Sequence, residues 1–330
     1  MAGRPSRPRY DRRVVTSADL VSPAVTVRVP AKVNLQLAVG PLRPDGYHGV
    51  VTVYQAISLF DEVTVRPAGE RGPIVVTGED AAQVPTGPTN LASKAVTALA
   101  RATGQRDRGR HTVRIEIRKR IPVAAGLAGG SADAAATLVA CNELWGTGLS
   151  QAQLGDIGAR LGSDVPFALT GGTAVGRGRG EQLTSALVSG TYHWALAFAA
   201  GGLSTPEVYA ACDRLRAGRP VPEPELSGPL MTALRSGDPA AVGAHLANDL
   251  QPAAISLRPE LRRTLAEGTD LGAVGAMVSG SGPTCLFLAR DAEHAREIAV
   301  SLTGSGSCRA VALASGPVPG AAIAGVREVV

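Results

Sequence analysis

The chain has 330 residues, of which 45% are hydrophobic and only 3% aromatic, so it can bury a large core made mainly of Val, Leu, Ile and Ala. No apolar run approaches the roughly 20 residues that span a bilayer, the N-terminus lacks the apolar segment of a signal peptide, and the four cysteines form no CxxC pair. We therefore expect a cytoplasmic protein with no membrane partner, no disulfide framework and no structural zinc site.

The formal net charge of +5 is concentrated at the start of the chain. The first thirteen residues hold five Arg and one Asp, a net of +4, which leaves about +1 for everything that follows. With almost nothing apolar to bury, residues 1–23 are expected to form a disordered basic tail. Such an arm can contact phosphates without sequence preference, but the near-neutral remainder makes a nucleic-acid partner unexpected.

Strand patterns dominate the chain from residue 24 onward. Alternating or continuous apolar segments predict strands at 25–29, 34–39, 50–59 and 61–66. The stretch RPDGYHG, from Arg43, predicts a turn between the second and third of these strands.

Helical patterns and a further strand follow. A helix is expected from residue 91, with Thr89 or Asn90 as its N-cap and Gly104 as its stop. The strict alternation of HTVRIEIRKR, at 111–120, predicts a strand with one solvated face. Further helices are expected at 131–144 and 151–161, and a loop, a short apolar segment and a hairpin at 162–183.

The pattern changes near residue 190, where we place a domain boundary. Strands and helices occur in both halves, which indicates an α+β protein with domains at 24–190 and 191–315 and a C-terminal tail at 316–330. In the second half, strands are predicted at 193–198, on both sides of SGSGP and at 309–314, with helices starting near Thr205, Ser227, Asp238, Arg258 and Asp291.

The stretch IPVAAGLAGGSADAA, from Ile121, places a loop of Gly and Ala directly before a helix. Several small residues together suggest that something approaches the backbone closely. A helix N-terminus presents free N–H groups and the positive end of the helix dipole, which suits a phosphate. The loop has no GxxxxGK[ST] motif and is not a GxGxxG turn, so by itself it is equally compatible with a tight connection.

Two other stretches bear on that choice. In VPAKVNLQL, Lys32 and Asn34 are two residues apart and share one face of a strand. In LGSDVPFAL, Asp164 precedes an apolar segment. A Lys and an Asp that converge on a phosphate loop would form a phosphoryl-transfer set, in which the Asp deprotonates a hydroxyl and the Lys neutralises charge. The alternatives are an ordinary surface Lys and an Asp that caps a turn.

Five ordered motifs, PAKVNL, RPDGYH, IPVAAGLAGGSADAA, GSDVPF and SGSGPT, resemble those of the galactokinase, homoserine kinase, mevalonate kinase and phosphomevalonate kinase (GHMP kinase) superfamily. Within it, PAKVNL and DGYH are similar to the kinases of the non-mevalonate (methylerythritol phosphate) route to isoprenoids and terpenoids. These use MgATP to phosphorylate the 2-hydroxyl of 4-diphosphocytidyl-2-C-methyl-D-erythritol. The resemblance covers roughly residues 25–314 and implies a two-domain GHMP kinase fold. Its N-terminal α+β domain is catalytic and binds ATP, its C-terminal α+β domain lies on the substrate side, and the active site is the cleft between them.

The resemblance also implies a role for each matching residue. Lys32 and Asp164 match the catalytic pair, and Asn34 lies where the family contacts the erythritol part. Tyr47 and His48 match residues that hold the cytidine end, where Tyr209 would stack on cytosine. The ATP-binding residues implied are Pro122, Val123, Ala124, Ala125, Gly126, Leu127, Ala128, Gly129, Gly130, Ser131 and Ala132, with Asn90 and Lys119 near the adenine.

The loop also departs from the family pattern, which is richer in Gly. Ala124, Ala125 and Ala128 are expected only where φ is negative. Ser131 and Asp133 are candidate Mg²⁺ ligands, and the metal site is otherwise unassigned.

Three rival functions remain open. A kinase for mevalonate or homoserine would not need Tyr47, His48 and Tyr209 for a cytosine. A non-catalytic nucleotide-binding homologue would not need Lys32 and Asp164. A basic-armed nucleic-acid binder conflicts with the charge distribution. The partners expected are ATP and the small-molecule substrate, and the chain is expected to be a monomer or a weak homodimer.

Overall fold

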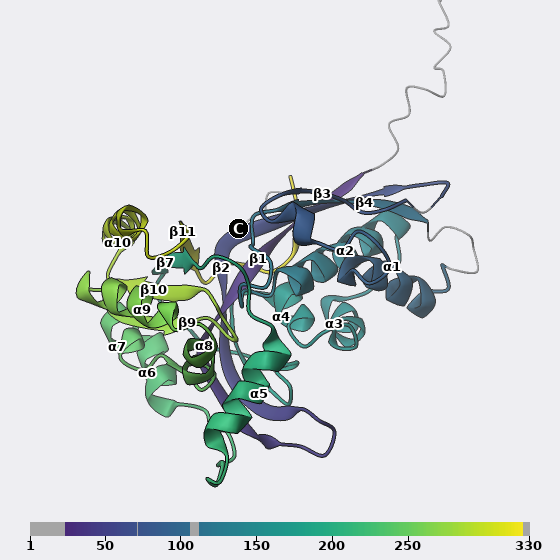
Figure 1. Ribbon diagram of the computed structural model, residues 1–330. Coiled ribbons are helices and arrows are strands. Elements are labelled where there is room, and N and C mark those ends of the chain that lie inside the picture. Colours follow the sequence, from purple (N-terminus) through teal and green to yellow (C-terminus); the bar gives the residue numbers. More distant parts are fainter. Residues whose placement is uncertain (1–23, 71, 106–111, 326–330) are drawn as a thin grey trace, which may run out of the picture.

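The computed structural model describes residues 24–70, 72–105 and 112–325 of the chain. The basic tail expected at residues 1–23 lies outside them. Two sheets, each covered by helices, lie side by side, and the chain passes from the first to the second after residue 190 (Figure 1).

A long antiparallel hairpin forms the centre of the first sheet. β1 (Val25–Leu42) pairs with β2 (His48–Pro67), and the backbone N–H of Arg43 donates to the carbonyl of Tyr47 at 2.8 Å to close the turn between them. The sequence predicts four shorter strands here. They merge because register shifts after Pro30, Asn34 and Val39 interrupt the alternation of side chains without ending the pairing.

The other strands of the first sheet extend this hairpin on both sides. The order is β12-β1-β2-β4-β3, with β5 and β6 beyond β2 and β8 beside β1. Their bounds are β3 (Val75–Gly78), β4 (Val113–Lys119), β5 (Thr173–Arg177), β6 (Gln182–Ser185), β8 (Ala247–Asn248) and β12 (Ala322–Ile323). Part of the segment assigned from sequence to a C-terminal tail is therefore paired, since β12 lies against β1.

Helices pack on one face of the first sheet. They are α1 (Leu91–Ala102), α2 (Gly129–Trp145), α3 (Gln151–Ala159) and α4 (Val165–Thr170), with the short 3₁₀ helix η1 (Ala81–Gln83) after β3. Asn90, one of the two caps predicted, caps α1 by accepting from the N–H of Ala92 at 2.8 Å. α2 contacts β1, β2, α1 and α4, and its small side chains allow this close packing.

The second sheet has the order β11-β7-β10-β9. Its strands are β7 (Tyr192–Phe198), β9 (Gly275–Val278), β10 (Cys285–Ala289) and β11 (Ala310–Gly316). The helices of this half are α5 (Thr205–Arg216), α6 (Gly228–Ser236), α7 (Pro239–Gly243), α8 (Gln251–Leu257), α9 (Glu260–Asp270) and α10 (Ala292–Ser305). Only α8 is not predicted from sequence, because seven residues give about two turns and too little periodicity.

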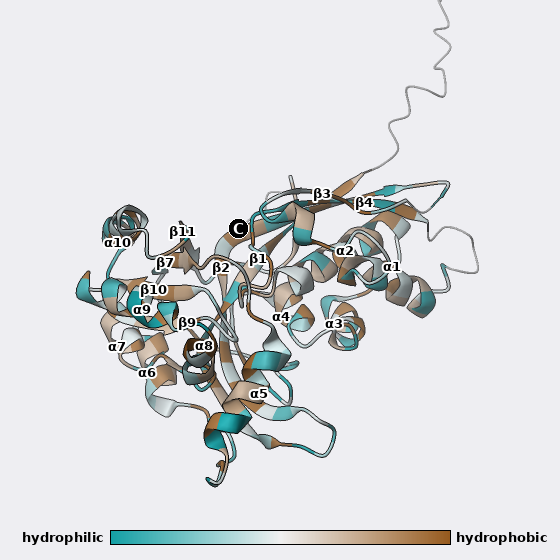
Figure 2. Ribbon diagram, viewed as in Figure 1, coloured by the Kyte–Doolittle hydropathy of each residue, from teal (hydrophilic) through white to brown (hydrophobic). Residues whose placement is uncertain are grey.

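One hydrophobic core joins the two halves. The largest buried cluster contains Val33 of β1 and Leu138 of α2 together with Trp194 of β7 and Leu286 of β10. Hydrophobic residues run along the strands, whereas α9 shows hydrophilic residues on its outer turns (Figure 2). Among the described helices, none is both long and apolar enough to cross a membrane.

Candidate active site

A cavity of about 850 Å³ lies where the two halves meet. The first half contributes β1, β2, the loop before α2 and the start of α4, and the second half contributes α5 and the β9–β10 loop. Leu127 and Ala132 alone among the site residues predicted from sequence do not line it, because both side chains are buried in the core. Those that line it are Lys32, Asn34, Tyr47, His48, Asn90, Lys119, Pro122, Val123, Ala124, Ala125, Gly126, Ala128, Gly129, Gly130, Ser131, Asp164 and Tyr209.

Lys32 and Asn34 lie on one face of β1, as their spacing predicts. The Nζ of Lys32 donates to Oδ1 of Asn34 at 2.7 Å, and the Nδ2 of Asn34 donates to the hydroxyl of Thr52 at 2.8 Å. Burial lowers the pKa of Lys32, and the nearby carboxylate of Asp164 opposes this shift. Lys32 is therefore a desolvated ammonium group aimed by a hydrogen-bonded chain, and not a surface lysine.

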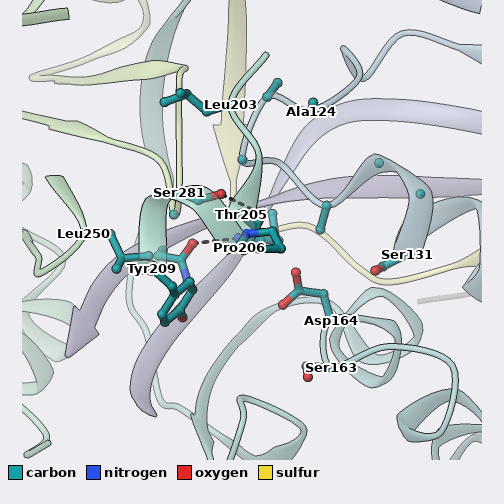
Figure 3. A pocket seen from close by; sticks show the side chains of 18 of the residues that line it. Ala124, Ser131, Ser163, Asp164, Leu203, Thr205, Pro206, Tyr209, Leu250 and Ser281 are labelled. Atoms are coloured by element: carbon teal, nitrogen blue, oxygen red, sulfur yellow. Dashed lines mark hydrogen bonds between the residues drawn. The ribbon is translucent and has the colours of Figure 1, made fainter. Parts of the chain in front are cut away.

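Asp164 stands immediately before α4, and its side chain makes no capping hydrogen bond. Instead, its Oδ1 accepts from the hydroxyl of Tyr54 at 3.0 Å, while the Tyr54 ring stacks on Phe167 with centroids 4.8 Å apart. Burial and the Asp164 carboxylate raise the pKa of Tyr54, so this phenol stays a donor. Figure 3 shows the Asp164 carboxylate in the cavity, with Ser131 on one side and Tyr209 on the other.

The loop between β4 and α2 presents backbone N–H groups to the cavity. α2 begins at Gly129, two residues earlier than predicted, and its N-cap is Ala128, which has no side-chain acceptor. The backbone N–H of Ala132 donates to the carbonyl of Ala128 and so forms the first hydrogen bond of this helix. The amides of Gly129, Gly130 and Ser131 are therefore free to bind an anion, as at other uncapped helix N-termini.

Two alanines of this loop have left-handed backbone conformations. φ is +52° at Ala124 and +60° at Ala128, so the prediction that both have negative φ is wrong. Such conformations cost an Ala on the order of 1 kcal/mol each, and they persist only where neighbouring groups impose them. Two contacts from the second half hold this part of the loop: the N–H of Leu203 donates to the carbonyl of Ala124 at 3.4 Å, and the hydroxyl of Ser279 donates to the carbonyl of Gly126 at 3.1 Å.

Lys119, at the end of β4, lies under the start of α2. Its Nζ donates to Asp61 and, at 2.8 Å, to Asp133, and all three side chains are buried. Burial raises the pKa of Asp133 to about 7 although Lys119 opposes this shift. Lys119 is thus already paired with two carboxylates, and the Oδ1 of Asp133 has no hydrogen-bond partner in the described part of the chain.

The opposite end of the cavity is aromatic. The rings of His48 and Tyr209 lie 5.1 Å apart, and the Nε2 of His48 is 2.9 Å from Oδ1 of Asp213, also on α5. Tyr47 is 54% exposed in the turn between β1 and β2, and the guanidinium of Arg179 lies 5.0 Å from its ring centre. A planar polar ring could bind here between aromatic faces and directed polar groups.

Sequence reasoning did not identify Tyr54, Asp61, Arg179 and Asp213, which contact the predicted site residues. Tyr54 and Asp61 stand in an alternating strand, where a polar group is easily taken for part of a solvated face. Asp213 stands on an amphipathic helix among other charged residues. Only Arg179, in the glycine-rich hairpin GRGRG, carried a local signal, because glycine-rich turns often approach ligands.

Comparison with known proteins supports a common ancestry. Residues 90–172 match the family model of the GHMP kinases N terminal domain, and residues 230–308 match that of GHMP kinases C terminal. A 4-diphosphocytidyl-2-C-methyl-D-erythritol kinase of Thermobifida fusca (strain YX) is 54% identical over 91% of this chain and 98% of that protein. The enzyme of the same name from Streptomyces avermitilis is 55% identical over 91% and 99%.

Solved structures agree with this grouping. A crystal structure of 4-(cytidine 5'-diphospho)-2C-methyl-D-erythritol kinase superposes with a TM-score of 0.68 at 34% identity, covering 88% of this chain and 98% of that one. Homoserine kinase from Cytophaga hutchinsonii superposes with a TM-score of 0.69 at 19% identity, over 92% and 98%, which shows a common fold alone. The chain therefore belongs to the GHMP kinase superfamily and, within it, to the 4-diphosphocytidyl-2-C-methyl-D-erythritol kinases of the non-mevalonate isoprenoid pathway.

Proposed function

We propose that this kinase transfers the γ-phosphoryl group of ATP to the 2-hydroxyl of 4-diphosphocytidyl-2-C-methyl-D-erythritol, with Lys32 and Asp164 as its catalytic pair. One observation carries the assignment: a buried ammonium and a hydrogen-bonded carboxylate line the same cavity as the free amides of α2 and the His48–Tyr209 pair. The amides suit the phosphates of ATP, and the aromatic pair suits a nucleobase.

Asp164 has the surroundings of a general base. Tyr54 donates to one carboxylate oxygen and leaves the other for the substrate hydroxyl. As the hydroxyl oxygen bonds to the γ-phosphorus and the bond to the β-phosphate bridging oxygen breaks, the hydroxyl proton passes to Asp164 and ADP leaves. Lys32 offsets the negative charge on the transferred group, and the burial of its ammonium strengthens this attraction.

Magnesium fits one place in this cavity. Mg²⁺ is usually held by one or two carboxylates together with substrate phosphates, and the buried Oδ1 of Asp133 is an unpaired carboxylate oxygen beside the loop. Asp133, with the hydroxyl of Ser131, would hold the ion that accompanies ATP. When bound, the ion would neutralise charge on the β- and γ-phosphates.

The cytidine end of the substrate is assigned to Tyr47, His48 and Tyr209. His48 and Tyr209 offer a ring face and a ring nitrogen, and Asn34, next to Lys32, lies within reach of the erythritol part. The GHMP kinases for mevalonate and homoserine act on small substrates without a base, so an aromatic pocket of this kind favours the cytidyl substrate.

Release of ADP measures this function directly. We expect turnover with MgATP and 4-diphosphocytidyl-2-C-methyl-D-erythritol, and negligible ADP release above background with mevalonate, homoserine or methylerythritol without the cytidyl group. Equal turnover of the non-cytidyl substrate would overturn the assignment of the aromatic pocket. Preferred turnover of mevalonate or homoserine would overturn the substrate assignment.

A further inference from the structure

Asp80 lies outside the cavity but touches the loop that lines it. It stands between β3 and η1, and its side chain connects the phosphate loop to the second sheet. We propose that Asp80 is a positioning residue that holds the first residues of the loop between β4 and α2, the phosphate loop (residues 120–128), in the conformation that binds ATP. This inference rests on the proposed function, because it assigns ATP to that loop.

The carboxylate of Asp80 bonds directly to the loop backbone. Its Oδ2 accepts from the N–H of Val123 at 3.1 Å, and the side chain is only 12% exposed. The Asp80 backbone is itself left-handed, with φ of +50°. Asp and Asn adopt this conformation more readily than other side chains do, so the position favours a short carboxyl or amide side chain.

The other carboxylate oxygen of Asp80, Oδ1, contacts the side chains of Arg309 and Gln83. Nη1 of Arg309 lies 3.3 Å from Asp80 Oδ1 and 2.7 Å from Glu79 Oε1, and Nε2 of Gln83 donates to Asp80 Oδ1 at 3.3 Å. Arg309 directly precedes β11, and its backbone N–H donates to Phe198 of β7 at 2.7 Å. The second sheet therefore limits where Asp80, and through it Val123, can lie.

The residue that follows Val123 explains why such a restraint matters. Ala124 is left-handed, which an Ala adopts only under constraint. The N–H of Leu203 donates to the carbonyl of Ala124, and Gly202 packs against its Cβ so closely that a side chain at 202 would collide. Asp80 thus restrains the residue before Ala124, while the 202–203 segment restrains Ala124 itself. Without Asp80, Ala124 can relax toward negative φ and shift the loop that leads to the amides of α2.

Asp80 also precedes a second segment that lines the cavity. η1 follows Asp80 directly, and Val84, Pro85 and Asn90 beyond it line the cavity. Both segments linked by Asp80 belong to the half of the site assigned to ATP. The effect of its loss should therefore fall on ATP and not on the cytidyl substrate.

Asp80→Gly tests this with little disturbance of the backbone, since Gly tolerates positive φ. We expect the variant to raise KM for MgATP and the calorimetric Kd for MgADP about tenfold, the scale of one hydrogen bond to a charged group. KM for the cytidyl substrate should change less than twofold. Asp80→Asn should restore most of the affinity, because its amide oxygen can accept from Val123. Glu79→Ala, which removes the closer partner of Arg309 but no loop contact, should match the wild type.

Three results would overturn the proposal: unchanged MgADP affinity in Asp80→Gly, equal rises in both KM values with a lowered melting temperature, or no rescue by Asp80→Asn. The MgADP titration needs no turnover, so it separates this inference from the proposed function. If the wild-type chain failed to phosphorylate the cytidyl substrate, the substrate assignment would fall while the binding comparison still tested Asp80.

Discussion

At the scale of single residues, polar side chains assigned to the chemistry or to the substrate have hydrogen-bonded neighbours that orient them. Lys32 is held by Asn34, Asp164 by Tyr54, and His48 by Asp213. All three of these directed side chains line the cavity. Replacing a member of these pairs should therefore change one defined step and leave the fold intact.

Asp164→Asn should lower kcat by roughly 100-fold or more, the scale of a lost general base. The amide can still accept from Tyr54 through its oxygen, so the geometry is retained. The Kd for MgADP should change little, because we assign the nucleotide to the loop amides and not to Asp164. Steady-state kinetics with calorimetry check both values. Near-normal turnover would remove Asp164 from the mechanism.

Lys32→Met should abolish most of the rate without unfolding the protein. The folded-state pKa of Lys32 is lowered by burial, so its charge destabilises the fold at pH values below that pKa. This cost disappears as the pH rises from the folded pKa to the unfolded value of about 10.4. We expect Lys32→Met to melt at or above the wild-type temperature near pH 7, with an advantage that shrinks toward pH 10.

The exposed Lys94 is the matched control for this test, because Lys94→Met removes a charge without relieving burial. Melting temperatures measured across the pH range separate the two variants. A Lys32→Met variant much less stable than the wild type at pH 7 would point to a structural role instead.

Asp213→Asn tests how His48 is oriented. A carboxylate beside Nε2 favours a proton on that nitrogen and leaves Nδ1 as an acceptor, which suits the exocyclic amine of cytosine. The variant should raise KM for the cytidyl substrate several-fold, about the effect of weakening one hydrogen bond, with KM for ATP unchanged. Glu207→Gln, on the same helix but exposed, is the control. Equal effects on both KM values would contradict this role.

At the scale of elements, the start of α2 is the most constrained part of the site. A helix without a side-chain cap gives up stability at its N-terminus, and a left-handed Ala at the N-cap adds strain. Both features keep amides free for a ligand. The local cost at this position is therefore linked to binding.

Ala128→Gly should relieve that strain and raise the free energy of unfolding by up to about 1 kcal/mol. Ala132→Gly, four residues further into the same helix, should instead lower it by about 1 kcal/mol, because Gly is unfavourable in a helix interior. Chemical denaturation of both variants measures the contrast. A loss of stability in Ala128→Gly equal to that in Ala132→Gly would show that no strain is stored at the N-cap.

At the scale of the whole molecule, the shared core links the two halves. The Nε1 of Trp194 on β7 donates to Oε1 of Gln55 on β2 at 3.2 Å, and β8 and β12 return from the second half to pair with β1. The largest buried cluster therefore belongs to both halves at once. We expect them to unfold together.

The two tryptophans report on different halves, Trp145 at the end of α2 and Trp194 on β7. In Trp145→Phe, the remaining fluorescence follows the second sheet, and in Trp194→Phe it follows α2. Each variant should show one denaturation midpoint, shared by fluorescence and far-UV circular dichroism, as in a two-state transition. Separate midpoints within one variant would show that the halves unfold independently.

The sequence by itself determined the features that depend on near neighbours. Period-two spacing placed Lys32 and Asn34 on one face, the cap of α1 was narrowed to Thr89 or Asn90, and the Gly/Ala loop marked the start of a helix. Motifs in a recognisable order supplied the family, because the residues that carry the chemistry stand in short segments.

Only the tertiary structure decided which distant residues meet. Tyr54 and Asp164 are 110 positions apart, His48 and Asp213 are 165 apart, and Asp80 and Arg309 are 229 apart. Strand pairing and the packing of the two halves bring them together, and the alternation of residues within one strand does not show which distant segment it will contact. The left-handed Ala124 has the same origin, since contacts with Gly202 and Leu203 overrule the local preference of alanine.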